Sequence, residues 1–187
     1  WTPRDQFVSV VSGQSSYVLS PRPRLVLNAR WCSSVVTNRA LYCRDLTNAA
    51  WTKSNMTTAL SQTGIEGVAS SATLLTASAG NATALQTVTR AEDDWGFGLF
   101  IKRVTGTGAI SLTLDGGSTY TAITDDINAD GWTQIGIEQD DVTNPSFGIK
   151  ITTSTDAVAI DYAMASIDGI SVSAFTPILT TSANVSA

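Results

Sequence analysis

The sequence predicts an all-β protein, an antiparallel β-sandwich or jelly roll that follows an extended N-terminal arm. Three observations favour this fold. The 187 residues are rich in Ser, Thr, Val and Ile, a bias that suits strands. Short apolar runs are separated by turn residues at close spacing, a pattern typical of sandwiches and jelly rolls. Finally, no segment keeps an apolar stripe at helical spacing for long, so helix should be minor.

The strands can be placed in order along the chain. Alternation is clearest over residues 110–115, where Ile110, Leu112 and Leu114 would form one buried face. Turn residues at 106–108, 115–117, 129–131 and 143–145 separate neighbouring strands. The predicted strands are Phe7–Val11, Tyr17–Leu19, Leu25–Leu27, Ala72–Thr76, Ala84–Thr89, Trp95–Val104, Ala109–Leu114, Tyr120–Ile123, Trp132–Glu138, Phe147–Thr152, Ala157–Ala165 and Ile170–Val172.

Charge divides the chain. Residues 1–53 hold seven basic and two acidic residues, whereas residues 54–187 hold four basic and fourteen acidic ones. We expect three parts: a basic arm with short strands (1–38), the sandwich (39–175) and a C-terminal tail (176–187). Such asymmetry favours an arm that docks on an acidic surface, whether a neighbouring subunit, another protein or its own sandwich. The docking residues would be Arg22, Arg24, Arg30 and Arg39; the alternative is a solvated linker.

Some partners are not expected. The arginines are dispersed and no interleaved aromatics accompany them, which argues against nucleic acid. No apolar run reaches the ~20 residues of a membrane helix, and no signal-peptide pattern is seen. Because the chain begins at Trp1 instead of Met, we expect it to be a trimmed product.

Residues 41–53, here called the opening loop, have no strand or helix periodicity but carry an aromatic residue near each end. Asp45, Thr47 and Asn48 can bond nearby backbone groups and keep an irregular loop ordered. Tyr42 and Trp51 can bury flat faces and fasten the loop to a core. The segment should be an ordered loop at the start of the sandwich.

The opening loop resembles a phrase that begins jelly-roll domains, similar to carbohydrate-binding modules, in bacteriophage head-spike, head-fibre and tail-fibre proteins. The match runs from Leu41 to Lys53, with Cys43 in place of the usual Ser and Leu46 in place of an aromatic. Two further segments, 130–135 and 176–183, are similar to the strand start and closing phrase of these domains.

The resemblance implies a structural protein on the exterior of the virion, most simply a capsid decoration, head-fibre or spike component that docks through its arm. Its partners would be other virion proteins, in a homo-oligomer for which a trimer is a family expectation. The alternative is a glycan- or receptor-binding module of a tail fibre or spike. The same fold serves both roles, so the fold does not choose between them.

Catalytic constellations are missing from the sequence. The chain contains no histidine, which excludes Ser-His-Asp, Cys-His and His-metal arrangements. No pattern pairs two carboxylates for glycoside hydrolysis, so we expect a protein that is not an enzyme. Cys32 and Cys43 could form one disulfide, but assembly in a reducing cytoplasm favours two buried thiols.

Two kinds of binding residue are candidates. Trp95, Tyr120, Trp132 and Tyr162 could stack on a sugar ring, although a Trp that begins a strand is more often part of the core. Oxygen ligands alternate over the segment 126–131 as in the first half of a calcium loop, but the closing Glu is missing. The alternative is a polar turn, and no other cofactor is expected. The calcium ligands would be Asp126, Asn128 and Asp130.

Overall fold

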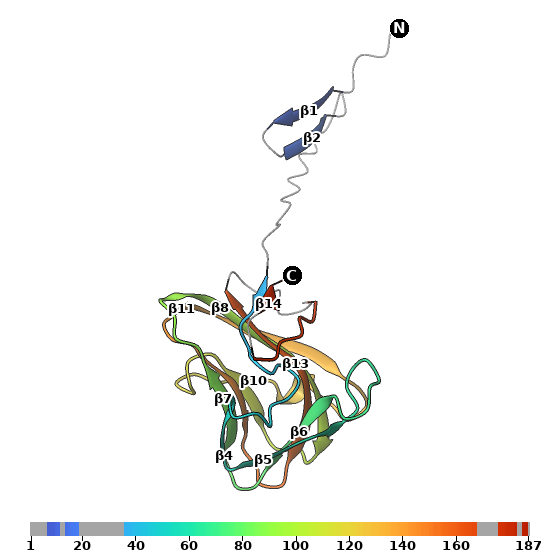
Figure 1. Ribbon diagram of the computed structural model, residues 1–187, viewed down its shortest axis with the longest axis vertical. Coiled ribbons are helices and arrows are strands. Elements are labelled where there is room, and N and C mark those ends of the chain that lie inside the picture. Colours follow the sequence, from blue (N-terminus) through green and yellow to red (C-terminus); the bar gives the residue numbers. More distant parts are fainter. Residues whose placement is uncertain (1–6, 12–13, 19–35, 168–175, 183–184, 187) are drawn as a thin grey trace. The chain divides into compact units, whose positions relative to one another are not determined.

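The structure, a computed structural model, describes residues 7–11, 14–18, 36–167, 176–182 and 185–186. The chain divides into two compact units, Trp1–Ser34 and Val35–Ala187. In the first unit, β1 (Phe7–Val11) and β2 (Gln14–Val18) pair as an antiparallel hairpin (Figure 1). The predicted strands Leu25–Leu27 and Ile170–Val172, and the arm residues Arg22, Arg24 and Arg30, lie outside the described residues.

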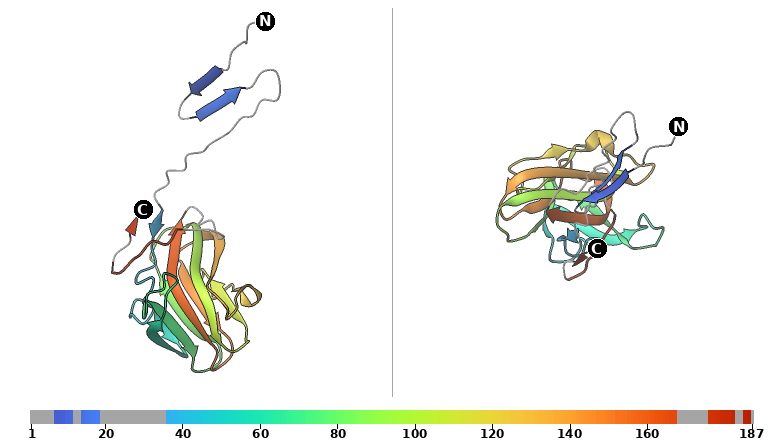
Figure 2. Two further views of the ribbon diagram at one scale, coloured as in Figure 1. Left: turned by 90° about the vertical axis from the view of Figure 1, so that its right-hand side faces the viewer. Right: turned by 90° about the horizontal axis from the view of Figure 1, so that it is seen from above.

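The second unit is a sandwich of two antiparallel five-stranded sheets, which form facing layers in Figures 1 and 2. Sheet 1 has the order β10 (Thr121–Ala122), β9 (Ile110–Thr113), β12 (Ser146–Ile151), β7 (Ala82–Thr87), β4 (Thr52–Ser54). Sheet 2 has the order β11 (Thr133–Val142), β8 (Asp93–Thr105), β13 (Ala157–Ile167), β6 (Ala72–Ala77), β5 (Met56–Gln62). Two short strands, β3 (Thr37–Asn38) and β14 (Val185–Ser186), pair separately. The predicted antiparallel β-sandwich is confirmed.

The alternation in the sequence places the core between the sheets. Ile110, Leu112 and Leu114 are fully buried, as the period-two pattern predicted. Phe147 on β12 packs against Phe97 on β8, with ring centroids 5.2 Å apart, so aromatic side chains join the two sheets. Helix is minor: within the described residues the one helical element is the 3-10 turn η1 (Thr124–Asp126).

Strands β4 and β5 were not predicted. They lie at the edges of the two sheets, and most of their side chains are at least partly exposed. An edge strand is held chiefly by backbone pairing, here with β7 and β6, and this pairing leaves no apolar alternation in the sequence. Asn55 joins β4 to β5 with a φ of 53°, a left-handed conformation that Asn tolerates well.

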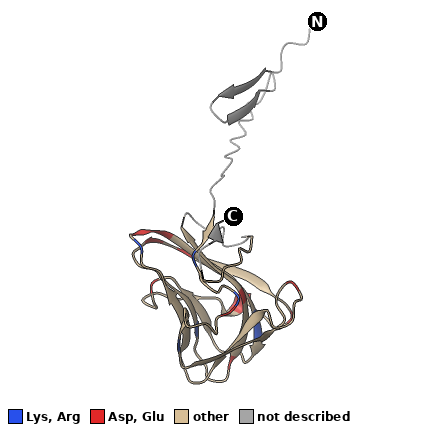
Figure 3. Ribbon diagram, viewed as in Figure 1, with Lys and Arg blue, Asp and Glu red and all other residues tan. Residues whose placement is uncertain are grey.

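Carboxylates are abundant on the sandwich and gather where β8 begins and β11 ends, as Figure 3 shows. The Asp141 amide donates to the Asp94 carboxylate across this end of sheet 2. No helix among the described residues has the length and apolar character needed to cross a membrane.

Candidate functional site

The opening loop is ordered by its own side chains and by the core. The Trp51 ring is buried, lies edge-on to Phe147 at a centroid distance of 5.9 Å, and donates from Nε1 to the Leu41 carbonyl at 3.0 Å. The Asp45 and Asn48 side chains accept hydrogen bonds from the backbone amides of Thr47 and Ala50. These contacts confirm the predicted ordered loop, with Trp51 as its buried anchor.

Arg44 ties the opening loop to sheet 2. Its guanidinium forms a two-point pair with Asp161 on β13, Nε to Oδ1 at 2.7 Å and Nη2 to Oδ2 at 3.0 Å. Nη1 donates to Glu66 and to the Tyr162 hydroxyl, while Nη2 also donates to Ser71. Burial alone would lower the pKa of Arg44, but the Asp161 carboxylate outweighs it and raises the pKa. Each side chain of this network is hydrogen-bonded to another member, so we interpret the network as structural.

Cys43 also has a structural place. Its thiol is free and buried, and its Sγ accepts a hydrogen bond from the Thr180 amide at 3.2 Å. Burial raises the pKa of this thiol. Residues 176–182 thus pack on the opening loop, with Ile178 and Thr180 buried. Cys32 lies outside the described residues.

The four predicted sugar-stacking aromatics differ in exposure. Trp95 is only 1% exposed and points into the core, so it offers no ring face to a ligand. Tyr162 is 6% exposed, and its hydroxyl is taken by Glu66 and Arg44; burial, followed by the hydrogen bond to Glu66, raises its pKa to about 12. Trp132 and Tyr120 are half-buried, and each lies beneath a lysine, Lys102 and Lys150 respectively.

The structure does not bring the calcium candidates into a ligand set. The Asn128 side-chain oxygen accepts hydrogen bonds from the Asp130 and Gly131 amides, which closes a polar turn. No group of three or more metal-binding side chains occurs within the described part of the chain. The geometry therefore matches the polar-turn alternative.

The outer face of sheet 1 is a broad polar surface. Core residues alternate with outward residues along β9, β12 and β7, and paired residues of neighbouring strands point to the same face. Two rows cross this face: Ala122, Ser111, Lys150, Thr83 and Ser54 in one, and Thr113, Gly148, Leu85 and Thr52 in the other. The rows contain five hydroxyl groups, one cation and no carboxylate.

Side chains in the middle of this face are buried or half-buried, and those at its edges are exposed. Ser111 and Thr113 are buried, whereas Thr52, Ser54 and Ala122 on the edge strands are exposed. Gly148 allows a close approach of β12 to β7, because a Cβ there would lie 2.0 Å from the Ala84 carbonyl oxygen.

Tyr120 stands beside this face on the loop that follows β9. The Lys150 Nζ lies 3.7 Å from the centroid of its ring. Asp115 shapes the loop: its Oδ1 accepts from the Gly117 and Thr119 amides, and Gly117 has the positive φ of 96° that glycine allows. A Cβ on Gly117 would lie 2.4 Å from the Tyr120 hydroxyl oxygen, so the loop main chain runs against the ring.

Acid should loosen this loop. Burial alone would raise the pKa of Asp115, but hydrogen bonds from Thr119, Thr113 and Gln139 outweigh it and lower the pKa from 3.8 to about 2. Because the folded pKa is the lower one, the unfolded chain binds the proton first, and the stability that Asp115 contributes is lost as the pH falls from 3.8 towards 2. We expect Asp115→Asn to lower the urea midpoint above this window, with the difference from the wild type shrinking near its lower limit. An equal difference in urea midpoint at a pH above 3.8 and at a pH near 2 would contradict the lowered pKa of Asp115.

Sequence reasoning named Tyr120 but missed Lys150, Ser111 and Thr83. The alternation in β9 and β12 assigns Ser111 and Lys150 to the face opposite the core, which is the signal that could have found them. That signal does not reveal that β12 lies between β9 and β7, and only this strand order brings the three residues into one row.

No protein-family model and no curated protein sequence matches the chain. Among solved structures, the C-terminal family 22 carbohydrate binding module of Clostridium thermocellum Xyn10B superposes with a TM-score of 0.52 and 14% identity, over 74% of this chain and 96% of the module. An exo-beta-agarase superposes with a TM-score of 0.50 and 8% identity, over 70% of this chain and 25% of the enzyme. The enzymatically active domain of bacteriophage CBA120 tailspike protein 4 superposes with a TM-score of 0.48 and 13% identity, over 70% of this chain and 21% of the tailspike chain. This TM-score is too low to support a conclusion.

Likeness at such low identity shows the fold alone. The chain has the jelly-roll sandwich of carbohydrate-binding modules, and the predicted jelly-roll architecture is thereby confirmed.

Proposed function

We propose that the sandwich is a non-catalytic carbohydrate-binding module that holds a glycan on the outer face of sheet 1. The observation that carries the proposal is the register of β9, β12 and β7, which places Ser111, Lys150 and Thr83 in one row beside the Tyr120 ring. The fold adds support, because it is that of a carbohydrate-binding module.

The chemistry of this face suits a sugar. A pyranose has an apolar face of C–H groups and a rim of hydroxyl groups, so it is bound by an aromatic ring together with side chains that donate and accept hydrogen bonds. Tyr120 supplies the ring. Ser111 and Thr83 supply hydroxyl groups, and Lys150 supplies a flexible donor that can leave the Tyr120 ring for a sugar oxygen.

Replacing the ring should remove most of the affinity. We expect Tyr120→Ala to weaken binding of the best neutral oligosaccharide from a glycan array about tenfold or more, measured by titration calorimetry. Trp132→Ala is the matched control, because Trp132 is the other half-buried aromatic beneath a lysine and lies at the edge of sheet 2. Unchanged affinity in a folded Tyr120→Ala variant, or a loss only in Trp132→Ala, would refute this site.

A second function rests on the N-terminal charge. We propose that the module belongs to a bacteriophage virion, as a decoration, fibre or spike protein in a homo-oligomer, and that its basic N-terminal segment docks on other virion proteins. The resemblance of the opening loop and the excess of basic residues over 1–53 support this location.

Truncation tests the docking role. The deletion should end at Ser34, because Asn38 is buried and its side chain donates to the Ala163 and Ile178 carbonyls. We expect a chain lacking residues 1–34 to keep the cooperative unfolding transition of the sandwich and the glycan affinity of the full chain but to lose co-sedimentation with phage particles. Normal incorporation into particles would contradict the docking role and leave glycan binding untouched.

A further inference from the structure

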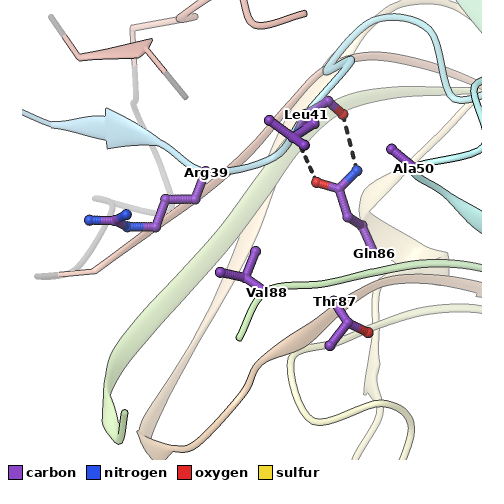
Figure 4. Close-up of a pocket in the computed structure, with 6 residues that line it drawn as sticks. All are labelled: Arg39, Leu41, Ala50, Gln86, Thr87 and Val88. Carbon is purple, nitrogen blue, oxygen red and sulfur yellow. Dashed lines mark hydrogen bonds between the residues drawn. The ribbon is translucent and has the colours of Figure 1, made fainter. Parts of the chain in front are cut away.

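A cleft of about 350 Å³ opens at the edge of sheet 1, between the opening loop and β7 (Figure 4). β4 pairs with β7 only over Thr83–Leu85, so the next residues of β7 have no β4 partner beside them. The opening loop takes that place, and the Gln86 side chain fixes it by two hydrogen bonds with the Leu41 main chain, of 2.6 and 3.1 Å. The lining residues are Arg39, Leu41, Ala50, Gln86, Thr87 and Val88.

Arg39 is the unusual member of this lining. Its backbone amide donates to the Ala165 carbonyl at 2.7 Å, but the Nε of its guanidinium is buried and has no hydrogen-bond partner among the residues that the structure describes. A buried donor without an acceptor costs free energy, so native structures rarely keep one without a reason. None of the ion pairs among the described residues includes Arg39.

Within the described part of the chain, the charges near Arg39 are more positive than negative. Burial lowers its pKa, the positive charge of Arg90 lowers it further, and the negative charge of Asp93 opposes them. Asp93 is itself shared, because its Oδ2 lies 3.7 Å from the Arg90 Nε. Of the described residues, two cations therefore share one carboxylate near Arg39, and an anionic ligand group would restore the balance.

We propose that this cleft is a second ligand site, which binds the carboxylate of an acidic sugar residue through Arg39. A guanidinium pairs with carboxylates through its N–H groups, and a charge-assisted bond to Nε would satisfy the buried donor. Leu41, Ala50 and Val88 provide apolar contacts for the sugar ring, and the volume lies within the usual ~300–1,000 Å³ of small-molecule sites. The inference rests on the proposed glycan binding and adds a preference for acidic residues.

The test uses pairs of oligosaccharides that differ only in charge: uronic-acid and sialic-acid oligosaccharides, and the same compounds with their carboxyl groups reduced to alcohols. We expect at least one acidic member to bind about tenfold more tightly than its reduced partner at low salt, and this preference to shrink as ionic strength rises. If neutral oligosaccharides bind but no acidic member is preferred, this inference fails and the proposed function stands. If none of the compounds binds, both fail.

Variants locate the preference. Arg39→Gln should abolish this preference, so that each acidic oligosaccharide binds no more tightly than its reduced partner. Lys102→Gln, which removes the same charge beside Trp132 on sheet 2, should leave the preference intact. Ala50→Leu should block the cleft without a change of charge, because Ala50 lines the cleft and leucine is larger. Figure 4 shows Ala50 at the end away from Arg39, so this variant does not alter the guanidinium itself. A preference that survives both Arg39→Gln and Ala50→Leu would overturn the inference.

Discussion

Arg44→Leu is expected to destabilise the sandwich by about 3 to 5 kcal/mol, the usual cost of removing one partner from a buried ion pair. The reason is Asp161, whose side chain is 0% exposed and would keep only the Ile65 and Tyr162 amides as donors. Urea unfolding followed by tryptophan fluorescence measures the change, because Trp51 and Trp95 are buried reporters.

Two variants show whether the buried pair is responsible. Glu66→Gln alters the exposed side of the same network and should leave the urea midpoint nearly unchanged. Arg44→Lys keeps the charge but not the two-point geometry, and should fall between the wild type and Arg44→Leu. If Arg44→Leu is as stable as Glu66→Gln, the pair between Arg44 and Asp161 does not hold the opening loop to sheet 2.

Trp51→Ala should have an effect of similar size, about 3 to 5 kcal/mol, because it empties a fully buried indole site. It also removes the edge-on contact with Phe147 and the hydrogen bond to Leu41. Thermal unfolding of Trp51→Ala beside Tyr42→Ala makes a matched comparison within one loop, since Tyr42 is only half-buried. Equal losses in the two variants would show that Trp51 is not the anchor.

The fold could be predicted because its signals are local. Ile110, Leu112 and Leu114 reveal a strand and its buried face without any knowledge of its neighbours. The opening loop could be predicted as ordered because Asp45 and Asn48 bond to amides only two residues away. Its chief attachment could not, because Arg44 and Asp161 are 117 residues apart and nothing in the sequence pairs them.

The proposed binding surface was harder to predict for the same reason. Four aromatics fit a sugar-stacking role by residue type, and only burial separates the core residue Trp95 from the accessible Tyr120. The row of hydroxyl groups depends on strand order, which brings β9, β12 and β7 together from distant parts of the chain. Arg39 was predicted as a docking residue from charge alone, and that role stays a prediction; the cleft that it lines could not be predicted, because it depends on Leu41 and Gln86, which are far apart in the sequence.

Chemical-shift mapping tests the central claim most directly. The ¹⁵N-labelled protein is titrated with the neutral oligosaccharide that binds best on a glycan array, and the backbone amides are followed. We predict the largest shifts at Ser111, Lys150, Thr83 and Tyr120, with little change over the outer face of sheet 2. Shifts confined to sheet 2, or no shift with any oligosaccharide, would contradict glycan binding on the outer face of sheet 1.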